Sequence, residues 1–108
     1  MGEFVKVLPA ADLAPGQCRE VLAGETPVAL CNLDGHFHAI GNRCPHRGGP
    51  LGQGALAGGL LLCPWHAWAY DVATGVSDVN TEISVPVYET RVEDGFVMVD
   101  PAPKPAAG

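Results

Sequence analysis

Two short segments of the chain each place one cysteine close to one histidine. The first is Cys44-Pro-His46, and the second is Cys63-Pro-Trp-His66, so that the complete pattern is C-x-H-x16-C-x2-H. Thiolates and imidazoles are ligands that proteins use for zinc, iron and copper. The four side chains therefore predict a metal centre built from two loops.

Two kinds of metal centre fit four such ligands. A structural zinc ion would take all four in a tetrahedron, although zinc modules usually pair Cys with Cys and His with His. A [2Fe-2S] cluster can instead hold both cysteines on one iron and both histidines on the other. Because each segment carries one residue of each type, it can supply one ligand to each iron. This arrangement favours the binuclear iron centre, with zinc as the alternative.

The mixed ligand set has an electrostatic consequence. Two thiolates neutralise the formal charge of an oxidised Fe2S2 core, whereas four would leave it negative, so adding an electron is easier with two imidazoles. Such centres have potentials from roughly −150 to +300 mV. Because reduction strengthens the hold of each imidazole on its proton, we expect the potential to fall with pH once those protons are lost.

A family resemblance covers the chain from Phe4 to Val99. The segments that carry it are CPHRGGPLGQG and CPWHAWAYDVATG, which resemble the two cluster-binding loops of Rieske proteins. The matching features are both Cys-Pro steps, both histidines and their separation, Gly48, Leu51, Gly54 and the closing D-x-x-T-G. The resemblance implies an all-β, Rieske-like fold of small antiparallel sheets with a cluster-binding subdomain formed by two loops.

The resemblance also implies the ligand set and the domain limits. Cys44 and Cys63 would ligate one iron of a single [2Fe-2S] cluster, and His46 and His66 would ligate the outer iron. The Rieske domain would cover residues 1–100, with its cluster-binding subdomain at about 42–72. Residues 101–108, rich in Pro and Ala, are expected to form a flexible C-terminal tail.

Departures from the family pattern indicate the subclass. Respiratory Rieske proteins join the two loops by a disulfide, but Gly49 and Trp65 occupy those positions here. Trp68 stands where high-potential members have a serine that hydrogen-bonds the cluster. Tyr70 is retained, and its hydroxyl either donates to a cysteine sulfur or only packs in the core. These features predict a low potential, and we expect Trp65 to shield the cluster rim from water.

The other cysteines and histidines have simpler interpretations. Cys18 and Cys31 lie outside both loops and do not replace the missing disulfide, and Cys31 is expected in the core because free cysteines are commonly buried. His36 and His38 share one face of a predicted strand. Without a third ligand nearby, they are interpreted as an exposed or edge pair rather than a metal site.

Short strands joined by turns must position the loops. Alternating residues and turn signals predict strands over 4–8, 17–22, 28–33, 36–40, 60–63, 68–72, 85–92 and 96–100. Asp34-Gly35 and Glu93-Asp94-Gly95 predict hairpin turns, residues 42–59 are predicted as loop, and no amphipathic helix is expected. In the family a proline-bearing third loop covers the cluster, and Pro86 is the candidate for that role.

Composition narrows the classes of function. The 108 residues suit one domain, and the net charge of −6 argues against nucleic acid as a partner. The sequence has no run of about eighteen or more apolar residues and no leader-like N-terminus, so we expect no membrane association and a cytoplasmic location. The excess of acidic over basic residues suits docking on a partner with a basic surface.

The resemblance implies a Rieske-type ferredoxin, an electron-transfer component rather than an enzyme. It would pass single electrons from a flavin reductase to a terminal oxygenase, with Arg47 either a docking residue or an ordinary exposed arginine. The chain is too short for a complete oxygenase, which also needs a mononuclear iron site. The alternatives are the small Rieske subunit of an assimilatory nitrite reductase and a structural zinc-binding interaction module.

Overall fold

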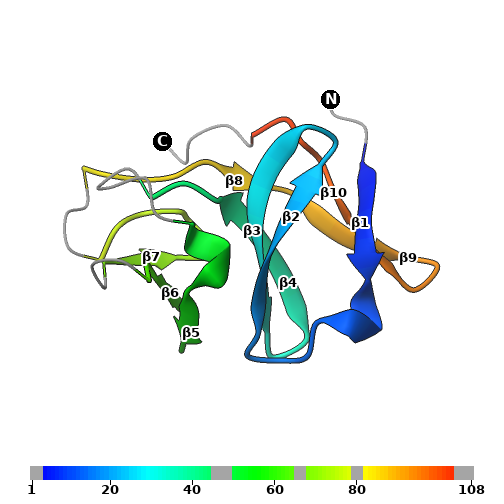
Figure 1. The fold of residues 1–108 in the computed structure, drawn as a ribbon, viewed down its shortest axis with the longest axis horizontal. Helices are drawn as coiled ribbons and strands as arrows, with labels where there is room; N and C mark the ends of the chain where they lie inside the picture. Colours follow the sequence, from blue (N-terminus) through cyan, green and yellow to red (C-terminus); the bar gives the residue numbers. More distant parts are fainter. Residues whose placement is uncertain (1–3, 45–49, 65–67, 79–81, 104–108) are drawn as a thin grey trace.

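The computed structural model describes residues 4–44, 50–64, 68–78 and 82–103, and ten strands in these residues form three antiparallel sheets (Figure 1). The strands are β1 (Val5–Pro9), β2 (Cys18–Ala23), β3 (Thr26–Leu33), β4 (His36–Gly41), β5 (Ala55–Ala57), β6 (Leu60–Leu62), β7 (Ala69–Asp71), β8 (Val87–Tyr88), β9 (Thr90–Glu93) and β10 (Phe96–Val99). Two single-turn 3-10 helices, η1 (Ala10–Asp12) and η2 (Leu51–Gln53), complete the elements. The all-β fold predicted from the sequence is confirmed.

The central sheet, in the order β2-β3-β4-β8, lies between the other two sheets (Figure 1). Its strand β3 is buried on both faces, which explains the unbroken apolar run in the sequence. On one face Val28 and Leu30 join a core with the β1-β10-β9 sheet. On the other face Ala29 and Cys31 join a core with the β5-β6-β7 sheet.

Two predicted hairpin turns are present. Asp34 and Gly35 connect β3 to β4 with φ angles of 53° and 91°, and Asp94 and Gly95 connect β9 to β10 with φ angles of 52° and 80°. Positive φ at both central residues is typical of the type I′ turn, whose twist matches that of the flanking strands. The local sequence was therefore sufficient to predict both connections.

The prediction of one strand over 85–92 is wrong. Strand β8 ends at Tyr88 and β9 begins at Thr90 because the two strands join different sheets. Strand β8 pairs with β4, whereas β9 pairs with β10. Their apolar pattern is continuous in sequence, so only the tertiary pairing reveals the break.

The prediction that 42–59 is entirely loop is also wrong in part. This range contains η2 and β5, and β5 pairs with β6 across the turn formed by Gly58 and Gly59. Three residues are too few to show a periodic pattern, so this strand depends on its partner. Strands β5 to β7 all fall inside the range expected for the cluster-binding subdomain.

In the part of the chain that the structure describes, no helix is long and apolar enough to cross a membrane. Of the predicted tail, residues 101–103 are described and residues 104–108 lie outside the described ranges. The flexibility of the tail stays a prediction.

Gly54 provides a test of how closely the first loop packs on β6. A Cβ at this position would overlap the carbonyl oxygen of Leu62. We expect Gly54→Ala to lower the free energy of unfolding by about 2 kcal/mol or more, because either the backbone or the pairing of β5 with β6 must shift. Urea unfolding followed by circular dichroism measures this change.

The matched control is Gly58→Ala. Gly58 has a φ of 56°, but a Cβ at this position would extend into open space, so this variant should lose only about 1 kcal/mol through backbone strain. An equal loss of unfolding free energy in the two variants would contradict the prediction that the close packing at Gly54 adds to the cost.

Candidate metal centre

Each cysteine of the predicted centre lies at the closed base of a loop. The first loop is closed by a bridge between Arg43 and Pro50, directly beside Cys44. The second connects β6 to β7, and the Cys63 amide donates to the Trp68 carbonyl over 2.6 Å. Both thiols are therefore attached to backbone that neighbouring strands fix in place.

The two thiols belong to one core. Cys44 is 0% exposed and Cys63 is 2% exposed, and both pack in the cluster of buried side chains that includes Leu51, Leu61 and Tyr70. Two buried thiols brought together from separate loops fit the sulfur side of a two-iron cluster. His46 and His66 lie outside the described residues, as do Arg47, Gly49 and Trp65, so their predicted roles stay predictions.

Tyr70 contacts one of these thiols directly. Its hydroxyl lies 3.1 Å from the Cys44 Sγ, and the whole side chain is buried. Burial raises the pKa of Tyr70, and the neighbouring Cys44 raises it further, so the phenol keeps its proton. When Cys44 is a thiolate, this hydroxyl must be the donor. Of the two interpretations of Tyr70, the structure favours the bond to a cysteine sulfur over packing alone, although the side chain is also part of the core.

Trp68 is half-buried and packs against the same core. Its indole stands where a serine hydroxyl would lie in a high-potential Rieske protein. The side chains around the cysteines therefore include a phenol donor at Tyr70 but no hydroxyl at position 68. This combination supports the low potential predicted from the sequence.

Removing the phenol donor should lower the reduction potential. A hydrogen bond to the Cys44 sulfur stabilises the reduced state, which carries more negative charge, so Tyr70→Phe favours the oxidised state. A difference of about 1 kcal/mol between the two states corresponds to roughly 40 mV for one electron. Protein-film voltammetry measures the shift.

Tyr88→Phe is the control for this measurement. Tyr88 is also a buried tyrosine, but it belongs to the core on the opposite face of the central sheet. Its replacement should leave the potential unchanged. A drop of similar size in both variants would contradict a specific role for the bond from Tyr70 to Cys44.

A polar network that the sequence did not predict fixes the first loop. The Glu20 carboxylate on β2 accepts hydrogen bonds from Asn42 Nδ2 over 2.6 Å and from Gln53 Nε2 over 2.8 Å. Asn42 Oδ1 in turn accepts the Gly52 amide over 2.7 Å. The network ties β2 to the residues on both sides of the loop that contains Cys44. Because these residues are far apart in the sequence, no local pattern identified them.

Glu20→Ala should loosen the first loop. At neutral pH we expect a loss of about 1 kcal/mol in the free energy of unfolding, since two hydrogen bonds to a charged but solvent-exposed group are removed. The two donors lower the pKa of Glu20 below its ordinary value of 4.5. The stabilisation is therefore present above that value and is lost as the pH falls through the lower, folded-state pKa.

Urea unfolding at neutral and acidic pH checks both parts of this prediction. The difference between wild type and Glu20→Ala should shrink in acid, as the pH falls below the ordinary value of 4.5 and through the lower pKa of the folded carboxylate. Glu25→Ala, in the exposed turn between β2 and β3, is the control and should change little. A difference that persists unchanged in acid would contradict the carboxylate network.

The remaining candidates lie outside the two loops in sequence. Cys31 is 0% exposed, so its predicted place in the core is confirmed. His36 is exposed and His38 is half-buried, both on β4, which fits their interpretation as an exposed or edge pair. Among residues 82–86, it is Ile83 and Val85 that pack on the core of Cys44 and Cys63.

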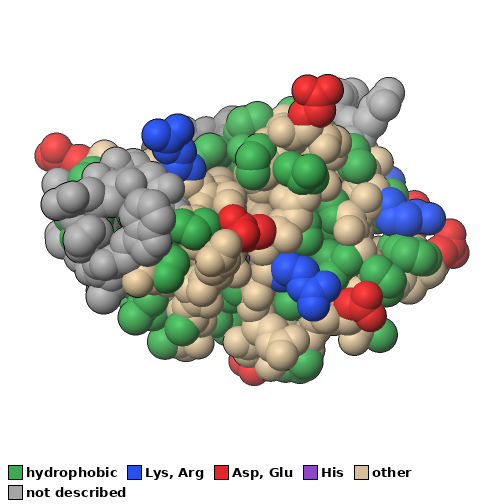
Figure 2. Space-filling view, in the orientation of Figure 1, with side chains coloured by type: hydrophobic (Ala, Val, Ile, Leu, Met, Phe, Trp, Pro, Cys, Tyr) green, Lys and Arg blue, Asp and Glu red, His purple; other side chains and the backbone are tan. Residues whose placement is uncertain are grey.

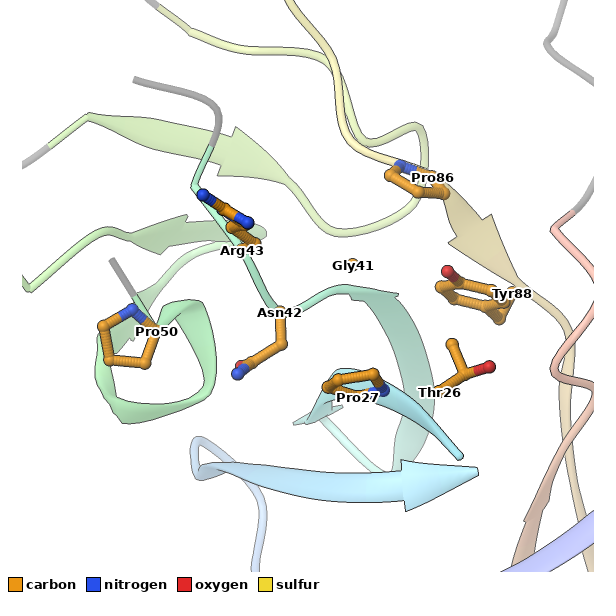
Figure 3. Close-up of a pocket in the computed structure, with 8 residues that line it drawn as sticks. All are labelled: Thr26, Pro27, Gly41, Asn42, Arg43, Pro50, Pro86 and Tyr88. Atoms are coloured by element: carbon orange, nitrogen blue, oxygen red, sulfur yellow. The ribbon is translucent and has the colours of Figure 1, made fainter. Parts of the chain in front are cut away.

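Pro86 lies beside the first loop. Its carbonyl accepts the Gly41 amide over 2.8 Å, and its ring lines a pocket of about 510 Å³ that Figure 3 shows. The residues around this pocket are Thr26, Pro27, Gly41, Asn42, Arg43, Pro50, Pro86 and Tyr88. Pro86 thus packs next to the base of the loop, and its role in covering the cluster stays a prediction.

Comparison with known families decides the class of protein. Residues 3–89 match the Rieske [2Fe-2S] domain. The chain belongs to the Rieske family. It therefore holds one Rieske [2Fe-2S] cluster, and the two buried thiols, one of them hydrogen-bonded to Tyr70, fit that cofactor.

Curated Rieske relatives include both larger and similar-sized proteins. Human apoptosis-inducing factor 3 is 39% identical over 82% of this chain, which spans only 15% of that protein's length. Ferredoxin CarAc of Metapseudomonas resinovorans is 34% identical over 89% of this chain and 92% of its own length. The Rieske domain thus occurs in these relatives both as a small ferredoxin and as part of a much longer chain.

Solved Rieske structures match nearly the whole fold. A chain in the complex of reduced oxygenase and oxidized ferredoxin of carbazole 1,9a-dioxygenase superposes with a TM-score of 0.85 at 32% identity, covering 94% of this chain and 95% of that chain. An NADH-dependent nitrite reductase small subunit from Mycobacterium tuberculosis superposes with a TM-score of 0.84 at 30% identity, covering 92% and 95%. Both kinds of protein named by the sequence resemblance are therefore structural neighbours.

Proposed function

We propose that this protein is a one-electron carrier in which Cys44 and Cys63 ligate the inner iron and His46 and His66 the outer iron. The observation that carries the proposal is the pair of buried thiols at the closed bases of two loops, one of them bonded to Tyr70. The pattern of one cysteine and one histidine per loop supports the histidine ligands.

When bound, the cluster accepts and releases one electron at a time. The residues of the chain keep that centre in a fixed environment. Tyr70 holds its proton and donates it in a hydrogen bond to Cys44. The apolar core around Cys44 and Cys63 excludes water from the sulfur side, and the Glu20 network keeps the first loop in place.

The electrons would come from a flavin reductase and pass to a terminal oxygenase. The similar-sized ferredoxin relative and the neighbour from an oxygenase–ferredoxin complex support transfer to an oxygenase, whereas the flavin reductase is proposed from the family resemblance alone. The second candidate is the small subunit of an assimilatory nitrite reductase, which the Mycobacterium tuberculosis neighbour supports. In either system the chain acts as an electron-transfer component in the cytoplasm rather than as an enzyme by itself.

The charge on the surface of the chain bears on how it would meet a redox partner. The chain carries a net charge of −6, but acidic and basic side chains are interspersed on the face that Figure 2 shows. Complementary charge should therefore raise the rate of encounter with a basic partner without defining one contact patch on that face. The imidazoles of His46 and His66 are the proposed exit for electrons, and Arg47, next to His46 in the sequence, is the candidate docking residue.

Substitution of a loop histidine tests the ligand assignment. His66→Ala should lose the Rieske absorption and electron paramagnetic resonance spectrum and at least about tenfold in electron-transfer rate. His36→Ala, on β4 and outside both loops, should keep both. Retention of the spectrum in His66→Ala, or a colourless wild-type protein that contains zinc, would contradict the assignment.

Electron transfer with purified partners separates the two candidate systems. In the oxygenase system, a flavin reductase reduces the protein and a terminal oxygenase reoxidises it, while a nitrite reductase large subunit reacts slowly. The reverse preference would identify a nitrite reductase subunit. Stopped-flow absorbance of the cluster follows each half-reaction separately.

A further inference from the structure

Two cysteines outside the cluster loops face each other in the central sheet. Cys18 on β2 and Cys31 on β3 are directly opposite in the antiparallel register, and their Sγ atoms lie 2.8 Å apart as free thiols. The adjacent main-chain bond runs from the Asn32 amide to the Gln17 carbonyl. Cys18 and Cys31 therefore form a non-hydrogen-bonded pair, the position in a sheet where opposite Cα atoms approach to about 4.5 Å.

This spacing suits a covalent bond between the two sulfurs. Disulfides join residues whose Cα atoms lie roughly 4.4–6.8 Å apart, with an S–S length of about 2.05 Å. The Sγ atoms of Cys18 and Cys31 are already close to that separation. Bond formation therefore requires a small adjustment of side chains rather than a rearrangement of the sheet.

The thiols of Cys18 and Cys31 differ in their exposure to solvent. Cys18 is half-buried, whereas Cys31 is 0% exposed and lies in the same core as Cys44 and Cys63. The hydrogen bond between the two thiols lowers the pKa of Cys18, while that bond and burial raise the pKa of Cys31. A reagent in solution therefore meets Cys18 first, and Cys18 more readily supplies the thiolate.

The geometry points to a second redox site in this protein, a Cys18–Cys31 thiol–disulfide couple that exchanges two electrons with small-molecule disulfides such as glutathione disulfide. This site is separate from the iron ligands and goes beyond the proposed one-electron carrier. The oxidation state of Cys18 and Cys31 would then follow the ratio of glutathione disulfide to glutathione in the solution.

The exchange takes place in two steps. The Cys18 thiolate attacks one sulfur of glutathione disulfide, which forms a Cys18–glutathione mixed disulfide and releases one glutathione thiolate. Cys31 then loses its proton and attacks the Cys18 sulfur, which forms the Cys18–Cys31 bond and releases the second glutathione. Two protein thiols are oxidised, one glutathione disulfide is reduced to two glutathiones, and the two protons leave with them.

Counting free thiols in the cluster-loaded protein tests the proposal. The protein is equilibrated without oxygen in buffers of increasing ratio of glutathione disulfide to glutathione and is then denatured in N-ethylmaleimide. Because denaturation releases the cluster, all four cysteines of the reduced protein should be alkylated. In oxidising buffer we expect two adducts, at Cys44 and Cys63, and a peptide that links Cys18 to Cys31. Four adducts at every ratio, or a different link, would overturn the proposal.

Two variants test the order of attack. Cys31→Ala removes the resolving thiol, so Cys18 should accumulate one bound glutathione per chain. Cys18→Ala leaves only the buried thiol of the pair, and neither a cross-link nor an adduct should form. In both variants the visible spectrum of the cluster should persist, which confirms folding and keeps Cys44 and Cys63 occupied. Absence of the adduct in folded Cys31→Ala, or its appearance in Cys18→Ala, would contradict the role of Cys18.

Discussion

Burial of two thiols from separate loops in one apolar core is the constraint on which the rest of this structure depends. Cys44 and Cys63 are almost completely inaccessible, although metal-binding loops are connections that would ordinarily run over the surface. The fold resolves this conflict by closing each loop at its base, through the Arg43–Pro50 bridge and the bond from the Cys63 amide to the Trp68 carbonyl, so that each cysteine stays in the core. The β5-β6-β7 sheet and one face of the central sheet supply the walls of that core.

Two side chains next to the buried cysteines act on the reduction potential of the cluster. Tyr70 contributes a proton that stays in place over the physiological range, because burial disfavours the phenolate. Trp68 adds apolar volume but no hydroxyl. Both of these side chains are attached to strand β7 or directly precede it.

Much of this structure could be predicted from the sequence, for reasons that are local. Asp34-Gly35 and Asp94-Gly95 favour one turn type, and the spacing of Cys44, Cys63 and Tyr70 is specific to one family. The network of Glu20, Asn42 and Gln53 could not be predicted, because it joins residues brought together only by the completed fold. The break between β8 and β9 was missed for the same reason. The residues of a strand do not show which other strand it pairs with, and these two strands pair with β4 and β10 in different sheets.

The pairing of β4 with β8 has a consequence for the architecture as a whole. Gly41 and Pro86 are joined by a main-chain hydrogen bond, so the chain leaves the central sheet and returns to it at the same place. The residues between them, which include both loops, are in effect a single insertion whose ends already meet. This insertion does not carry a complete core of its own, because Ala29 and Cys31 of the central sheet form part of its core. Glu20 on β2 also binds its first loop, so the sheet that the chain leaves is the surface on which the metal centre is assembled.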